Sequence, residues 1–309
     1  MRLLRGALRL IGDRNAILIL GFALGLALGP TVARRTEPLT LPALAVAITM
    51  TVSAISSRAV RPWRRLARMT LLAVGSSYGL GSAVILTLSW LLLRDQELLI
   101  GYVLLAAAPP GAAALALSAG LRGDLLLSLI GTVGAYLAAL FIAPVMTLLL
   151  AGPGLFDPLQ LLVVLLELVA VPLVVSRLLR TPRLLPYARR WREPVISWAF
   201  FLVILTVVGL NRDVFLLEPQ LVGLIALVPL GSTFGLGALV SWALRRLRVR
   251  RPTRVSLILF ATIKNSGLAA AVALALVSLR ASLPGAVATA LNVLYLIWLG
   301  VRARREAPG

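Results

Sequence analysis

The sequence contains no cysteine and no histidine among its 309 residues. Without cysteine there is no disulfide framework and no thiol to act as nucleophile or metal ligand. Without histidine the chain lacks the commonest general base, the commonest metal ligand and the usual proton relay. Acidic residues are also few, 11 Asp+Glu against 31 Lys+Arg. These absences argue against an enzyme, because the familiar catalytic constellations cannot be assembled.

Apolar side chains are abundant instead. The chain is 60% hydrophobic and 14% charged, with a mean hydropathy of +0.98. Its apolar runs repeatedly approach the roughly 20 residues that a helix needs to cross a bilayer. The net charge of +20 does not indicate a nucleic-acid partner, because the arginines stand in short tracts between these runs. The sequence therefore predicts an all-α polytopic protein of a prokaryotic cell membrane, whose partner is the lipid bilayer.

The runs predict ten spans, and we interpret the first as a span rather than a signal peptide. The basic residues are distributed unevenly over the connections. Five arginines lie on one side, Lys264 lies inside a span, and the other 25 of the 31 basic residues lie on the opposite side. The positive-inside rule then predicts that both termini are cytoplasmic. The predicted spans are residues 15–33, 39–57, 67–93, 97–120, 125–151, 158–180, 194–211, 219–245, 254–278 and 284–301.

The two halves of the chain resemble each other. SSYGLGSAV begins at Ser76 and STFGLGALV begins at Ser232, an offset of 156 residues. The same offset relates Gly111, in PPGAAALA, to Gly267, in NSGLAAAV. Each half holds five predicted spans, so two halves in series enter the membrane from opposite sides. We therefore expect a single membrane transport domain over 1–309, built from inverted repeats of about 1–154 and 155–309.

Two spans are interrupted at corresponding positions near the predicted midplane. The fourth carries Pro109-Pro110-Gly111 and the ninth carries Asn265-Ser266-Gly267. Consecutive prolines remove two backbone donors, and broken backbone is tolerated in a membrane only where protein or a cavity surrounds it. Paired interruptions in matching spans are typical of a transporter binding site. We expect the two broken helices to cross.

These segments resemble the bile acid:sodium symporter family. The resemblance rests on the Pro-Gly break, on the Gly123-Asp124 turn followed by Leu127-Ser128, on the Ala143-Pro144 ending, and on KNSGLAAAVALA in the ninth span. It implies ten helices divided into a core domain and a panel domain. It also implies alternating access and sodium-coupled uptake of a small organic anion.

The sodium ligands that the resemblance implies are only partly present. A Ser-Asn pair is replaced by Ala114 and Leu115, and a Glu by Phe260. Ser128 and Thr132 remain; they are four residues apart and share one helix face.

A further polar ligand would fall near Ser76, and Lys264 stands where the family has Gln. A hard cation prefers several oxygen ligands. The residues present therefore argue against a sodium site of the family type and predict no cofactor, with sodium or a proton as the candidate coupling ion.

Lys264 is the only lysine of the chain. We predict that it lies at the C-terminal end of the first half of the ninth helix, where unpaired carbonyls carry partial negative charge. An ammonium there would replace a bound sodium ion. A second interpretation is a structural ion pair with Glu167, the one acidic residue placed inside a span. Asn265 and Ser266 complete the candidate ion or substrate site.

The function predicted from these features is secondary transport of a small organic anion. The alternatives are a cation/proton antiporter of related fold, or a sodium-coupled symporter with a rebuilt ion site. Ser232, Thr233 and Asn292 are weaker candidates for the cavity lining, because helix packing explains them equally well. Substrate identity and oligomeric state cannot be predicted from this sequence.

Overall fold

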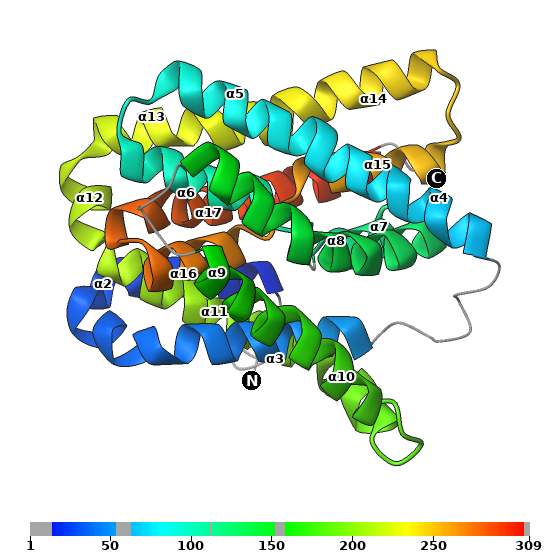
Figure 1. The fold of residues 1–309 in the computed structure, drawn as a ribbon, viewed down its shortest axis with the longest axis horizontal. Helices are drawn as coiled ribbons and strands as arrows, with labels where there is room; N and C mark the ends of the chain where they lie inside the picture. Colours follow the sequence, from blue (N-terminus) through cyan, green and yellow to red (C-terminus); the bar gives the residue numbers. More distant parts are fainter. Residues whose placement is uncertain (1–13, 54–62, 112, 152–157, 306–309) are drawn as a thin grey trace. The chain divides into compact units, whose positions relative to one another are not determined.

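The computed structural model describes residues 14–53, 63–111, 113–151 and 158–305 (Figure 1). Every regular element in these ranges is helical, which confirms the all-α prediction. The elements are α2 (Arg14–Thr36), η1 (Glu37–Leu39), α3 (Thr40–Ser53), α4 (Trp63–Val74), η3 (Gly75–Gly81), α5 (Ser82–Leu92), α6 (Gln96–Ala107), α7 (Ala113–Gly120), α8 (Leu125–Ala151), α9 (Pro158–Leu165), η4 (Leu166–Ala170), α10 (Val171–Leu178), α11 (Leu185–Leu210), α12 (Arg212–Leu217), α13 (Pro219–Leu230), η5 (Gly231–Gly235), α14 (Leu236–Arg246), α15 (Arg251–Thr262), α16 (Ser266–Leu276) and α17 (Leu279–Arg305).

The chain divides into two compact units, and each draws on both halves of the sequence. Unit 1 consists of Met1–Ala54 and Val163–Val222; unit 2 consists of Ile55–Leu162 and Gly223–Gly309. The interrupted helices and the lysine between them belong to unit 2.

Unit 1 is held together by close packing of α2 against α11. Gly21 and Gly25 are one turn apart on α2, and a Cβ atom added to either would lie 3.0 Å or less from a backbone carbonyl oxygen of α11. Small residues at this spacing let two membrane helices approach closely. α2 kinks at Gly29, whose positive φ of 63° precedes Pro30 and suits a glycine.

In unit 2, two long helical rods each contain a π-helical segment. Figure 1 shows α4, η3 and α5 as one rod, and α13, η5 and α14 as another. The segments are GSSYGLG in η3 and GSTFG in η5, and each begins at a glycine, Gly75 or Gly231. A π-helical turn shifts the faces that follow it, and such turns are frequent at functional sites.

Four pairs of helices at corresponding positions of the two halves have equal lengths, whereas α7 has 8 residues and its counterpart α16 has 11. α4 and α13 each have 12 residues, and α5 and α14 each have 11. α6 and α15 each have 12, and α8 and α17 each have 27.

Six helical segments of the described chain are long and apolar enough to cross a membrane. One of them, Ala16–Ser53, runs through the first two predicted spans. Predicted spans four and nine are each divided by a break, and their halves α6 and α16 are shorter apolar helices. The membrane-protein prediction is therefore supported.

One predicted boundary differs clearly from the structure. α11 begins at Leu185, nine residues before the span predicted from residue 194. The added stretch contains Arg189, Arg190 and Arg192. A span predicted from hydropathy ends at such charged residues, although the helix itself continues through them.

The close contact between Gly25 of α2 and the backbone of α11 predicts the effect of a larger side chain at this position. Gly25→Leu should lower the apparent melting temperature of the detergent-purified protein, because its Cβ would lie 2.9 Å from the Leu205 carbonyl oxygen. Overpacking typically costs about 1–3 kcal/mol. Gly223→Leu is the matched control, since nothing lies within 4 Å of an added Cβ there. Equal melting temperatures for the two variants would contradict this packing.

Candidate functional site at the helix crossing

The two broken helices of unit 2 meet at their breaks. Pro110 and Lys264 form an isolated antiparallel bridge. The Gly111 N–H donates to the Ile263 carbonyl over 3.1 Å, and the Asn265 N–H donates to the Pro109 carbonyl over 2.8 Å. The expected crossing of the fourth and ninth helices is therefore present within unit 2. Gly111 packs closely against the other break, because an added Cβ would lie 3.2 Å from the Lys264 carbonyl oxygen.

The prolines leave backbone carbonyls available at the end of α6. In a continuous helix the N–H of residue 110 would bond the carbonyl of Ala106. Pro110 has no N–H, so the Ala106 oxygen must find another donor. The chain leaves helical geometry at Ala108, whose ψ is 144°. The break thus turns the carbonyls of Ala106 and Ala108 into acceptors for a cation.

The ammonium of Lys264 occupies this position. Its Nζ donates to the carbonyl oxygens of Ala106 and Ala108 over 2.9 and 3.1 Å and to the Ser82 hydroxyl over 3.1 Å. Nζ also lies over the face of the Tyr78 ring, 4.2 Å from its centroid, in a cation–π contact. Three acceptors match the three N–H donors of an ammonium. The Lys264 side chain is only 4% exposed.

We call the carbonyls of Ala106 and Ala108, the Ser82 hydroxyl and the Tyr78 ring the lysine cage. These groups compensate for the burial of a charged lysine. A lysine at the centre of a membrane helix costs about 2.5–3.5 kcal/mol on insertion scales. Hydrogen bonds to a charged group contribute about 1.5–3 kcal/mol each, and a desolvated cation over an aromatic face adds about 2 kcal/mol. These three bonds and the aromatic face offset the cost of burial.

The π-helical segment η3 positions the rest of the cage. Tyr78 lies inside it and Ser82 follows it directly. Gly81 lets the rod approach the end of α15, since an added Cβ would lie 2.5 Å from the Ala261 carbonyl oxygen and 3.7 Å from Cε of Lys264.

Sequence reasoning missed Tyr78 and Ser82 and pointed to Ser76 instead. Ser76 lies in η3 and is half-buried. Its neighbour Ser77 is fully buried, and no hydrogen-bond partner is found for its hydroxyl oxygen.

Asn265 and Ser266 begin α16 and hold it in place. The Asn265 side chain accepts from the Leu268 N–H as an N-cap and donates to the Tyr136 hydroxyl over 3.1 Å. The Ser266 hydroxyl accepts from Thr289 and from Asn292 of α17, over 2.9 and 3.0 Å. Both side chains therefore fix the second broken helix.

Ser128 belongs to a separate cluster of buried hydroxyls. It lies 2.7 Å from the Ser118 hydroxyl and 2.9 Å from that of Ser256, and these two are 3.2 Å apart. Thr132 donates to the backbone carbonyl of Ser128. The hydroxyl cluster thereby joins α7, α8 and α15.

The remaining candidates lie elsewhere. Ser232 and Thr233 are in η5 and both bond the Pro229 carbonyl. Glu167 lies in η4 of unit 1 and is exposed. Its predicted pairing with Lys264 stays a prediction.

The apolar helices and the two breaks that meet at a buried lysine are features found in membrane transporters. The family comparison agrees. The chain belongs to the SBF-like CPA transporter family (DUF4137), whose model matches residues 16–298. This confirms the resemblance to bile acid:sodium symporters. No curated protein matches the chain significantly.

The cage predicts a measurable coupling between Lys264 and the face of Tyr78. In a double-mutant cycle, Tyr78→Leu with Lys264→Met should show a coupling free energy of unfolding of about 1–2 kcal/mol. Tyr78→Phe with Lys264→Met should show almost none, because Phe retains the aromatic face. Chemical denaturation in detergent measures both cycles. A coupling in the Phe cycle as large as in the Leu cycle would contradict the contact.

Proposed function

We propose that this protein is a secondary transporter that moves a small organic anion across the cell membrane by alternating access, with Lys264 in the place of a coupling sodium ion. The single observation that carries the proposal is the Lys264 cage. A tethered monovalent cation donates to carbonyls freed by a helix break, at the position where broken-helix transporters hold an ion. The family match supports transport as the activity.

An inverted repeat of two five-helix halves supports this mechanism. The equal helix lengths favour it, as does the 156-residue separation of Gly75 and Gly231, the first residues of the two π-helical segments. The 38-residue segment Ala16–Ser53 would extend about 57 Å if straight, close to twice the roughly 30 Å of hydrocarbon. It can therefore supply two passes, as ten spans require.

The two units correspond to the panel and core that the family resemblance implies. Unit 1 contains most of predicted spans one, two, six and seven, and unit 2 contains the crossed helices. In this scheme unit 2 carries the fixed cation through both orientations. An organic anion would be attracted by that charge without a sodium ion entering beside it. Both termini would be cytoplasmic.

Transport by reconstituted protein tests the proposal. Proteoliposomes should take up one or more of a panel of radiolabelled organic anions, including taurocholate and short-chain carboxylates. The initial rate should be unchanged when an inward sodium gradient is replaced by potassium. Lys264→Met should reduce uptake at least tenfold, because the cage then has no cation. The control is Gly223→Ala, at an exposed position in α13.

A sodium gradient that accelerates wild-type uptake severalfold would contradict the proposal and favour a rebuilt sodium site. The placement of a titratable lysine at the crossing also favours a second candidate, a cation/proton antiporter. An internal pH dye in the same proteoliposomes separates the two. Proton flux driven by a cation gradient, with no anion uptake, would identify the antiporter.

A further inference from the structure

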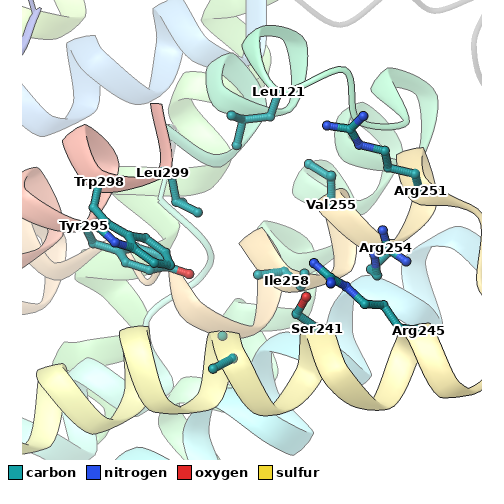
Figure 2. Close-up of a pocket in the computed structure, with 12 residues that line it drawn as sticks. Leu121, Ser241, Arg245, Arg251, Arg254, Val255, Ile258, Tyr295, Trp298 and Leu299 are labelled. Carbon is teal, nitrogen blue, oxygen red and sulfur yellow. The ribbon is translucent and has the colours of Figure 1, made fainter. Parts of the chain in front are cut away.

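A cavity of about 100 Å³ lies in unit 2, away from the lysine cage (Figure 2). Its walls come from α14, α15 and α17, together with Leu121 at the end of α7. It is far smaller than the roughly 300–1,000 Å³ of a site that encloses a drug-sized ligand. It can hold a compact chemical group while the remainder of a larger molecule stays outside.

One end of the cavity is strongly cationic. Arg245 reaches it from the last turn of α14, and Arg251 and Arg254 reach it from the first turn of α15. Figure 2 shows these three side chains at one side of the cavity, with the Ser241 hydroxyl beside them. The described residues that line the cavity include no Asp or Glu. Three guanidinium groups and a hydroxyl form a donor set suited to phosphate oxygens.

The opposite end is apolar and aromatic. Tyr295 and Trp298 of α17 stack there with 5.8 Å between ring centroids, near Leu121 and Leu299. Tyr295 is 1% exposed, whereas Trp298 is 40% exposed. A Cβ added to Gly237 would lie 2.6 Å from the Tyr295 hydroxyl oxygen, so this glycine makes room for the ring. The cavity thus joins a cationic pole to an apolar pole that continues to the protein surface.

We propose that this cavity binds the phosphate group of an anionic phospholipid, whose acyl chains lie along the outside of α17. The charge favours an anion, and the volume admits a phosphate but not a whole amphiphile. The position favours a lipid as the source, because α14 completes a candidate membrane span that ends at Arg246. Trp242 of α14 is exposed and has the Arg246 guanidinium 5.7 Å from its ring centroid, an arrangement typical of a membrane interface. Basic pockets between membrane helices bind anionic headgroups.

The test is lipid-dependent thermal stability of the full-length protein in detergent. Dioleoyl phosphatidylglycerol should raise the melting temperature saturably, because a ligand that binds only the folded state stabilises it. Dioleoyl phosphatidylcholine and inorganic phosphate at the same concentrations should not. Arg245→Gln/Arg254→Gln should raise the half-saturating concentration of phosphatidylglycerol at least tenfold.

Two further variants separate a site from general surface charge. Arg246→Gln/Arg250→Gln removes two positive charges from the same arginine tract, at residues that do not line the cavity. This control pair should change the half-saturating concentration of phosphatidylglycerol less than threefold. Ser241→Phe keeps every charge but fills the cavity, and should abolish the shift. The proposal is overturned if the control pair loses as much as the lining pair, if phosphatidylcholine stabilises equally, or if free phosphate reproduces the shift.

Discussion

The centre of unit 2 depends on the hydrogen bonds from the Lys264 amino group to the carbonyls that end α6, where α6, α15 and α16 meet. Two prolines end α6 and free its last carbonyls, and the lysine supplies the donors that those carbonyls need. Among the described residues, the backbones at the two breaks exchange two hydrogen bonds with each other. The side chain of Lys264 adds two more, to the carbonyls of Ala106 and Ala108. A neutral apolar residue at this position would remove the lysine donor from the Ala108 carbonyl, at about 1–3 kcal/mol, whereas the Ala106 carbonyl would keep the Ser82 hydroxyl as a donor.

The same arrangement relates structure to transport. In the proposed function, the tethered ammonium takes the place of a coupling ion that would otherwise bind and leave in each cycle. Of the two retained hydroxyls, Ser128 contacts Ser118 and Ser256 on neighbouring helices, whereas Thr132 donates to the Ser128 carbonyl within α8. Neither hydroxyl is among the three acceptors that bond the Lys264 amino group. The lipid site proposed at the end of α14 would act on the same unit from its surface.

Much of this architecture could be predicted from residues whose effects are local. Pro109 and Pro110 break a helix wherever they occur, and the recurrence of Gly111 at Gly267 locates the second break. The cage could not be predicted, because Ser82 lies 182 residues from Lys264 and meets it only through packing. We predicted that Lys264 would end its own half-helix. It follows α15 closely, but its ammonium reaches the carbonyls of α6 instead. The sequence does not predict the early start of α11, because the arginines in its first turns have the charge expected of a connection between spans.

Sodium-dependent stability tests the central claim most directly. The melting temperature of wild type and of Lys264→Gln would be measured against sodium concentration, with potassium holding the ionic strength constant. A tethered cation predicts that wild type is indifferent to sodium and that the variant, with its carbonyls vacated, gains a sodium-specific rise. A sodium-specific rise in wild type would contradict the account, because it would require an ion site that exists beside the lysine.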